Sequence, residues 1–306
     1  MRVAVVGAGA IGCFYGGLLA KENNDVTFVA RGKTRDALEK QGLTVKSIWG
    51  NFSIPVKVVD SEHLDAVDAF DVILLAIKST ALEDALPELQ LISDESTRIA
   101  CLLNGIGNEE RLSDVFTEQQ IIGGSAFASV IREAPGVVNH VGEGRLVLGE
   151  WAAAKPTFPL KWLISAFQQA GADVSLSDNI RQIKWEKLLW NMTYNPLTAL
   201  TGTRVGEALD DPDLYHLLEK VSREYLALAS AAGVTIGADY QRALLIPDDD
   251  VRRHKTSMLQ DFENGREMEL QAILGFAIRV ANMHNVKVDT IETLHALLRF
   301  FQKKNR

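Results

Sequence analysis

The sequence feature that most constrains the fold is GAGAIG at residues 7–12, which lies between the apolar run RVAVV and a helical pattern. Gly7 allows a tight turn after a strand, Gly9 lets the backbone approach a pyrophosphate, and Gly12 permits close packing of the helix on the strand. Glycines in an ordinary turn are the alternative, but a second strand follows the helix, and this context favours a dinucleotide-binding turn. The residues predicted to bind the cofactor at this turn are Gly7, Gly9, Ala10, Ile11 and Gly12.

The first half of the chain alternates short apolar runs with helical patterns, which is typical of an α/β fold. The expected strands are RVAVVG, DVTFVA, VILLAI, RIACLL and QIIGGSAF, and the expected helices cover residues 11–22, 34–41, 80–90 and 107–115. Right-handed crossovers then give a mainly parallel sheet with helices on both faces, a Rossmann-type doubly wound fold. Residues 137–149 are expected to add an antiparallel hairpin, and residues 173–177 a last strand.

Helical patterns dominate the remainder of the chain, at residues 180–195, 212–232, 248–263, 266–284 and 290–302. Asp211 and Pro212 are residue types preferred where a helix begins, and Gly233 is a type preferred after a helix ends. We therefore predict a Rossmann-type dinucleotide-binding domain at residues 1–178 and an all-α domain at residues 179–306. The length of 306 residues agrees with two domains.

The composition argues against several classes of protein. A formal net charge of −8 speaks against nucleic-acid binding as the main task. Cys13 and Cys101 form no CxxC and no metal-ligand spacing, so we expect reduced thiols and no metal site. The N-terminal apolar run lacks a cleavage-like site, and no uncharged apolar stretch reaches the ~18 residues that a membrane span needs. The simplest prediction is a cytoplasmic protein.

The end of the second expected strand indicates which dinucleotide binds. NAD sites usually place Asp or Glu there, about 20 residues past the glycine motif, to bind the ribose 2′-hydroxyl. This chain has Ala30 and Arg31 at that place, with Lys33 close behind and no carboxylate before Asp36. A guanidinium can donate two hydrogen bonds to a phosphate, which favours NADP(H), and Lys78 after the VILLAI run could add charge. The alternative is that these cations are merely solvated loop residues.

The segment KWEKLLWNMTYNPLTAL at residues 184–200 is unusual because its apolar residues surround most of the circumference of a helix. Lys187, Asn191 and Asn195 recur every four residues and therefore share one stripe. Pro196 disfavours the α conformation at Asn195, so we expect the helix to end there. A cation and two amides in a row fit the wall of a polar cleft that faces an anionic ligand. A hydrogen-bond network between helices is the alternative interpretation.

Three further positions complete the candidate site. Asn104 in LLNGIGNEE follows an expected strand, so it would lie at the sheet edge where ligands collect, although Asn is also common in turns. Ser257 and Glu269 lie on successive expected helices, on either side of a turn at residues 264–265. Such a turn could bring a hydroxyl and a carboxylate to Lys187, while a surface position is the ordinary expectation for Glu269.

These widely separated motifs resemble the ketopantoate reductase (2-dehydropantoate 2-reductase) family along nearly the whole chain. The matching stretches are GAGAIG, Arg31, IKST with Lys78, NGIG with Asn104, NHVGEG, KWEKLLWNMTYNPLTAL and SMLQD-EN-GREMEL. The resemblance implies NADPH-dependent reduction of a small 2-oxo acid, ketopantoate, to (R)-pantoate, a step of pantothenate and coenzyme A biosynthesis. The site is expected in the cleft between the two domains.

The resemblance also implies a role for each candidate residue. Lys187 would be the general acid, and Glu269 would orient Lys187 or bind the substrate hydroxyl. The residues that would hold the substrate are Asn104, Asn191, Asn195 and Ser257. Asn104 could also bind the nicotinamide. The residues that would contact the 2′-phosphate of NADP are Arg31 and Lys78.

The chain departs from the family pattern at three positions, where Met268 replaces a small Thr, Gln271 an acidic residue and Leu274 an Asn. None of the three removes a proposed catalytic group, so they bear on the substrate more than on the reaction type. The alternatives are reduction of another branched 2-oxo acid, and a non-catalytic NADP-sensing module, which would have no use for the proton donor Lys187. The C-terminal helices, including residues 290–302, are the candidate face for a homodimer.

Overall fold

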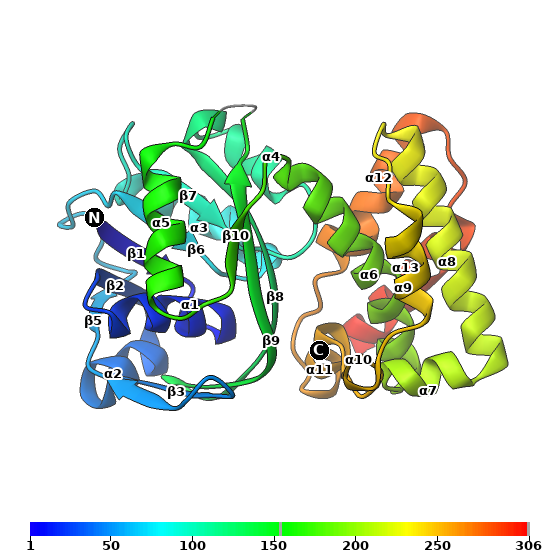
Figure 1. The fold of residues 1–306 in the computed structure, drawn as a ribbon, viewed down its shortest axis with the longest axis horizontal. Coiled ribbons are helices and arrows are strands. Elements are labelled where there is room, and N and C mark those ends of the chain that lie inside the picture. The colour runs from blue at the N-terminus through cyan, green and yellow to red at the C-terminus, as the bar shows by residue number, and fades with distance from the viewer. Residues whose placement is uncertain (153–154, 305–306) are drawn as a thin grey trace. The chain divides into compact units, whose positions relative to one another are not determined.

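The computed structural model describes residues 1–152 and 155–304, which form two compact units (Figure 1). The first unit consists of Met1–Leu103 with Asn108–Arg181, and the second of Asn104–Gly107 with Gln182–Arg306. The first unit ends at Arg181, close to the domain boundary expected after residue 178. The four residues from Asn104 to Gly107 were not expected in the second unit, because they come only a few residues after a strand of the sheet.

The first unit is built on one mixed sheet. Its strands in the described part of the chain are β1 (Arg2–Val6), β2 (Asp25–Ala30), β3 (Leu43–Ser47), β4 (Phe52–Ile54), β5 (Lys57–Asp60), β6 (Val72–Leu75), β7 (Arg98–Cys101), β8 (Ile121–Ala134), β9 (Val137–Glu150) and β10 (Val174–Leu176). The order across the sheet is β4-β3-β9-β8-β7-β6-β1-β2-β5, with β10 beside β9. The stretch from β5 to β8 is parallel throughout, which confirms the predicted doubly wound, mainly parallel sheet.

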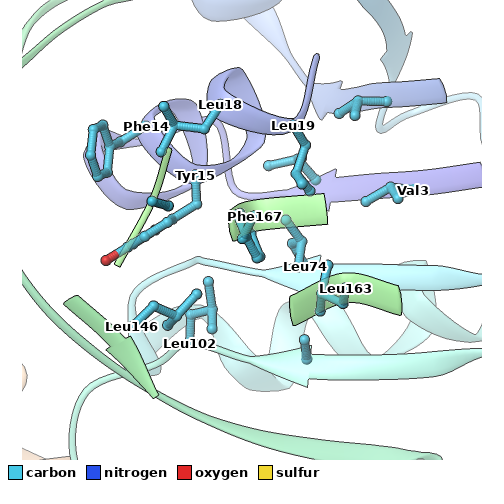
Figure 2. Close-up of a cluster of buried hydrophobic side chains, with 14 of the residues drawn as sticks. Val3, Phe14, Tyr15, Leu18, Leu19, Leu74, Leu102, Leu146, Leu163 and Phe167 are labelled. Atoms are coloured by element: carbon cyan, nitrogen blue, oxygen red, sulfur yellow. The ribbon is translucent and has the colours of Figure 1, made fainter. Parts of the chain in front are cut away.

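Helices cover both faces of this sheet. They are α1 (Ala10–Lys21), α2 (Gly32–Gln41), α3 (Leu82–Leu91), α4 (Asn108–Ser113) and α5 (Phe158–Gln169). In β6, Val72 and Leu74 belong to the core that α1 and α5 complete, whereas Ile73 and Leu75 are buried on the opposite face. Figure 2 shows side chains of β1 and β6 gathered with those of α1 and α5. Each buried large apolar side chain stabilises the unit by about 1.5–3 kcal/mol, so strands buried on both faces become continuous apolar runs.

The prediction for residues 137–149 was wrong in one respect. These residues do not fold back on themselves but form a single strand, β9, which pairs antiparallel with β8. The hairpin turn lies earlier, where Ala134 faces Val137 and Gly136 has a φ of +73°. The run QIIGGSAF is only the buried half of β8, because the second half of that strand is increasingly exposed and carries polar residues. β3, β4, β5 and α5 were also not expected.

The second unit is helical in the described residues, as predicted. Its helices are α6 (Ile180–Thr201), α7 (Val205–Asp210), α8 (Pro212–Ala231), α9 (Ala238–Leu245), α10 (Asp249–Arg252), α11 (Ser257–Glu263), a π-helical turn (Gln271–Gly275), α12 (Phe276–His284) and α13 (Asp289–Lys304). Asp211 caps α8 as expected, accepting hydrogen bonds from the N–H groups of Asp213 and Leu214. None of the helices within the described ranges is both long and apolar enough to cross a membrane.

Two expected helices differ from the structure. The helix expected at residues 248–263 is broken into α10 and α11, because Thr256 accepts a hydrogen bond from the Leu259 N–H and begins a new helix. The helix expected at residues 266–284 begins only at the π-helical turn. Glu269 therefore lies in an irregular segment before that turn, and not on a helix as predicted.

The predicted end of α6 at Asn195 was also wrong, because the helix continues through Pro196 to Thr201. A proline inside a helix costs about 3 kcal/mol, since it removes a hydrogen bond and crowds the preceding turn. Every residue from 191 to 199 is buried, so packing around the whole circumference offsets that cost. Thr198 also donates its hydroxyl to the Tyr194 carbonyl at 2.9 Å, which adds a hydrogen bond beside the proline.

Candidate functional site

Of the three glycines in the turn after β1, only Gly9 has room for a Cβ atom. A Cβ on Gly7, whose φ is +103°, would lie 2.6 Å from the Ala76 carbonyl carbon, and a Cβ on Gly12 would lie 2.0 Å from the Gly7 oxygen. Side chains are therefore excluded at both positions. A Cβ on Gly9 would meet no atom within 4 Å. The open space at Gly9, between two tightly packed glycines, fits the close approach of a pyrophosphate.

The start of α1 is suited to anions. Gly9 is the N-cap and offers no side-chain acceptor, and the first turn has no acidic residue. The N–H groups at the start of a helix have no partner within the helix, and the helix dipole places positive charge at the same end. The first-turn residues Ala10 and Ile11 can therefore present backbone donors to a diphosphate.

Two cations lie at the carboxyl edge of the parallel strands. Arg31 follows β2 directly, is the N-cap of α2 and has an exposed side chain. Lys78 follows β6, precedes a short 3₁₀ turn (Ser79–Ala81) and is half-buried. Because β1 lies between β2 and β6, the two cations flank the glycine turn. This arrangement fits a dinucleotide that carries an extra phosphate on its adenosine ribose.

The second unit holds a hydrogen-bonded set of three candidate residues. The Lys187 amine donates to the Asn104 side-chain oxygen at 3.1 Å. The Asn104 amide nitrogen donates to Glu269 Oε2 at 3.3 Å. Lys187 is on α6, Asn104 follows β7 in the sequence, and Glu269 precedes the π-helical turn. The structure thus brings together a cation, an amide and a carboxylate, all half-buried, from three distant parts of the sequence.

The position of Asn104 depends on the turn that follows it. Gly105 has a φ of +83°, and a Cβ there would lie 2.4 Å from the Ala272 carbonyl oxygen. The Ile106 N–H donates to the same oxygen at 3.4 Å. The Asn104–Gly107 segment therefore packs directly on the π-helical turn that follows Glu269. A π-helical turn is rare and often marks a functional site.

Two candidate substrate ligands are buried on the same helix as Lys187. Asn191 and Asn195 are 8% and 2% exposed. Because a buried amide needs partners for its donors and its acceptor, a polar ligand with complementary groups fits both. Of the alternative, a hydrogen-bond network between helices, the described residues show the bond from Lys187 to Asn104.

Ser257 is exposed at the first position of α11 and is not hydrogen-bonded to the Lys187 set. Its helix is nevertheless tied to α6, since the hydroxyls of Thr198 and Thr256 lie 2.7 Å apart in a buried hydrogen bond. Thr198 comes three residues after Asn195, so this bond holds Ser257 near the asparagine end of the stripe. Sequence reasoning missed both threonines, although Thr256 is a residue type preferred at an N-cap.

Glu269 is held by a residue that the sequence did not single out. The preceding backbone N–H, of Met268, donates to the Gln302 side-chain oxygen at 2.9 Å. Gln302 is near the end of α13, 34 residues further along. No sequence pattern links the two positions, because one of the two bonding groups is backbone.

The chain matches the family described as "Ketopantoate reductase PanE/ApbA" over residues 3–153 and the family described as "Ketopantoate reductase PanE/ApbA C terminal" over residues 179–302. It is 30% identical to a 2-dehydropantoate 2-reductase of Pyrococcus horikoshii, over 98% of this chain and 97% of that protein. The solved structure of a 2-dehydropantoate 2-reductase from Geobacter metallireducens has a TM-score of 0.91 and 33% identity, covering 100% of both chains. A D-mandelate dehydrogenase solved with NADH and anilino(oxo)acetate shares the fold, with a TM-score of 0.92 at 23% identity over 100% of this chain and 99% of that one.

Proposed function

This chain belongs to the ketopantoate reductase family of oxidoreductases, and from this premise we propose that it reduces 2-dehydropantoate (ketopantoate) to pantoate with NADPH. The observation that carries the proposal is the hydrogen-bonded set of Lys187, Asn104 and Glu269. These are the groups that a carbonyl reduction needs from the protein, namely a cation and proton donor with neighbours that orient it. The product would enter pantothenate and coenzyme A biosynthesis.

NADPH, when bound, supplies the hydride that reduces the ketone carbon. The protein's task is then to stabilise and protonate the carbonyl oxygen as negative charge grows on it. Lys187 as an ammonium does both, and positioned proton donors of this kind contribute about 10²–10⁴-fold to the rate. Asn104 restrains the amine through the 3.1 Å hydrogen bond, and Glu269 fixes the orientation of the Asn104 amide.

The polar groups along α6 are proposed to hold the rest of the substrate. Asn191 and Asn195 can donate to a carboxylate and accept from a hydroxyl, and ketopantoate carries both groups. Ser257 adds a hydroxyl at the start of α11. A 2-oxo acid bound in this way keeps its ketone near Lys187, since Lys187 and Asn191 are one helical turn apart.

NADPH is preferred over NADH in this proposal because of the adenosine end of the site. Arg31 stands where an NAD site usually has an acid, and Lys78 adds a second cation at the same edge of the sheet. Gly7, Gly9, Ala10, Ile11 and Gly12 would receive the diphosphate. Among the described residues, no group of three or more His, Cys, Asp or Glu is placed to hold a metal ion.

The departures from the family pattern bear on the alternative substrate. Met268 and Leu274 are 2% and 0% exposed and belong to the core of the second unit, where they pack against other apolar side chains. Gln271 is exposed, at the start of the π-helical turn. Met268 and Leu274 therefore act on packing near Glu269. The family of the chain favours ketopantoate over another branched 2-oxo acid. A non-catalytic NADP sensor is the weaker candidate, because it leaves the Lys187 set without a task.

The experiment that tests the proposal is NADPH consumption by the purified protein with ketopantoate, run beside NADH and a panel of other branched 2-oxo acids. Rapid, NADPH-selective turnover of ketopantoate is expected. Rapid turnover of a different 2-oxo acid alone would replace the substrate but keep the reaction. Tight NADPH binding without turnover of any acid would favour the sensor.

A cytoplasmic location stays a prediction from the sequence. We also propose that the protein forms a homodimer through α13. Leu297, Phe300 and Phe301 on this helix are 44%, 61% and 36% exposed, and three large apolar side chains on one exposed helix favour burial against a second copy. Light scattering of the wild type and of Phe300→Ser tests this, with a dimer expected for the first and a lower mass for the second.

A further inference from the structure

A carboxylate lies beside the place where Arg31 begins α2. Asp60 is the last residue of β5, and the parallel ladder sets it opposite Ala30, the last residue of β2. The Ser61 N–H donates to the Ala30 carbonyl at 3.1 Å, so the two strands stay paired to their carboxyl ends (Figure 1). Neighbouring strands are about 4.8 Å apart. Asp60 is therefore one strand away from the position where an NAD site places the acid that binds the ribose 2′-hydroxyl.

Arg35 neutralises this carboxylate. Arg35 lies one turn into α2, with its backbone N–H 3.4 Å from the Arg31 carbonyl, and its guanidinium forms a hydrogen-bonded ion pair with Asp60. The Asp60 side chain is 16% exposed and that of Arg35 is 34% exposed, so the pair is partly shielded from water. His63 is the other group near this carboxylate, with Nδ1 at 3.6 Å.

Asp60 stays ionised at neutral pH. The Glu62 N–H, which donates to Asp60 Oδ1 at 3.1 Å, and then the Arg35 guanidinium hold the pKa of this carboxyl below its usual range. Arg35 is in turn occupied by acids only, since Asp36 accepts from it at 3.0 Å and Glu39 lies 3.8 Å away on the same helix. Both terminal nitrogens of the guanidinium thus donate to carboxylates. Nε is buried and has no hydrogen-bond partner among the described residues, so it is not open to a phosphate either.

We propose that Arg35 contributes to cofactor preference, by compensating Asp60 so that a 2′-phosphate can bind beside Arg31. This inference rests on the proposed use of NADPH. An uncompensated carboxylate one strand away would repel the phosphate that Arg31 attracts. The same carboxylate, once released, would accept a hydrogen bond from the 2′-hydroxyl of NADH. The Asp60–Arg35 pair is therefore a second determinant of specificity beside Arg31, and it acts without contact to the phosphate.

The test is direct binding of NADPH and of NADH, by calorimetry or cofactor fluorescence, to the wild type, Arg35→Met, Asp60→Asn and the double variant. Arg35→Met is expected to lower the ratio of NADPH to NADH affinity by about tenfold or more. The double variant is expected to regain a ratio close to that of the wild type, because the Asp60 carboxylate that repels the phosphate is replaced by a neutral amide. Lys57→Met is the matched control, since Lys57 pairs with Asp25 at 2.7 Å at the opposite ends of the same two strands.

Four results would overturn the inference. An unchanged ratio in Arg35→Met would show that the pair does not set preference. An equal loss in Arg35→Met and in the double variant would show that Arg35 acts on the phosphate or on the pocket shape directly. If Arg35→Met does not fold, the comparison is made between the double variant and Asp60→Asn. A weaker NADPH affinity in the double variant would again show that Arg35 acts on the phosphate directly. A wild type that prefers NADH would overturn the proposed cofactor as well, which separates the two failures.

Discussion

Asn104 lies 83 positions before Lys187 in the sequence, yet its side-chain oxygen accepts a hydrogen bond from the Lys187 amine at 3.1 Å. The nitrogen of the same amide donates to Glu269 at 3.3 Å. An amide has one accepting and one donating end, so a carboxylate at one end fixes which atom faces the amine. The Lys187 amine therefore faces the accepting oxygen of Asn104, and this hydrogen bond restricts the orientation of the amine.

Replacement of Lys187 by Ala is expected to lower turnover of ketopantoate at least about a hundredfold, because the carbonyl oxygen loses its proton donor and its counter-charge. NADPH affinity is expected to stay nearly intact, since the glycine turn and Arg31 lie in the first unit. Steady-state rates and cofactor titration measure the two quantities. Near-normal turnover in Lys187→Ala would remove this residue from the mechanism.

Replacement of Asn104 by Asp keeps an acceptor for Lys187 but turns the donor toward Glu269 into a second carboxylate. Hydrogen bonds to charged groups contribute about 1.5–3 kcal/mol, so we expect kcat to fall by about tenfold or more. Two facing carboxyls titrate together, so the pH profile of kcat should also shift. The control is Asn264→Asp, at an exposed amide that donates to the Gln260 carbonyl at 2.6 Å. A pH profile identical to that of the wild type would contradict the proposed arrangement.

Replacement of Gly105 by Ala tests the packing of the Asn104 turn. The backbone there has a φ of +83°, and the new Cβ would meet the Ala272 oxygen at 2.4 Å. Gly265 has a φ of +62° with nothing within 4 Å, so Gly265→Ala carries only the conformational cost, about 1 kcal/mol. We expect Gly105→Ala to lose about 2–4 kcal/mol of unfolding free energy, measured with urea, and to lose activity. Equal losses in the two variants would mean that the turn can move away without cost.

Replacement of Gly9 and of Gly12 by Ala should separate binding from folding. A Cβ on Gly9 enters open space and its backbone φ of −91° suits Ala, so stability should hardly change. NADPH affinity should fall by about tenfold or more, because the methyl group occupies the space proposed for the diphosphate. A Cβ on Gly12 would lie 2.0 Å from the Gly7 oxygen, so Gly12→Ala should unfold at a lower temperature before any cofactor is added. Normal NADPH affinity in Gly9→Ala would place the diphosphate elsewhere.

His140 should make stability depend on pH. Its ring is 1% exposed, with Nδ1 2.8 Å from the Ser47 hydroxyl and Nε2 2.9 Å from the Glu143 carbonyl. Burial lowers the pKa of this ring, so the unfolded chain takes up the proton first as the pH falls through about 6.5. The free energy of unfolding is therefore expected to be full above that pH and to decrease below it, until the folded ring also binds the proton.

The measurement for His140 is urea unfolding between about pH 7.5 and 5, where His140→Gln is expected to show a shallower loss than the wild type. His216, whose side chain is 86% exposed, supplies the control variant His216→Gln. Equal slopes for the wild type and His140→Gln would show that this ring does not contribute to acid sensitivity.

The sequence predicted those parts of the fold in which local pattern and burial agree. Strands β1, β2, β6 and β7 are buried on both faces, so their apolar runs are continuous and visible. β4 and β5 are short and half-exposed at the edges of the sheet, so their residues show no such run. Pro196 led to the wrong prediction that the helix ends at Asn195. Its local effect on the backbone is outweighed by the burial of α6 among the other helices, which the sequence alone does not show.

The candidate site was predictable in its residue types but not in its connections. The spacing of Lys187, Asn191 and Asn195 shows that they share a face of one helix, and that reasoning needs only the helical period. The contact of Asn104 with Glu269 joins residues 165 positions apart, and no period links them. The bond from Met268 to Gln302 uses a backbone donor, which carries no signal in the sequence.

The four residues from Asn104 to Gly107 have a consequence for building hybrid enzymes. They belong to the helical unit, although both flanking segments belong to the sheet unit. A chimera joined only near Arg181 would pair the Lys187 and Glu269 of one relative with the Asn104 turn of another. At Gly105 that turn leaves no space for a Cβ atom beside the π-helical turn, so parts from two parents that differ there would pack poorly. The helical units of two relatives can therefore be exchanged only if residues 104–107 are exchanged together with them.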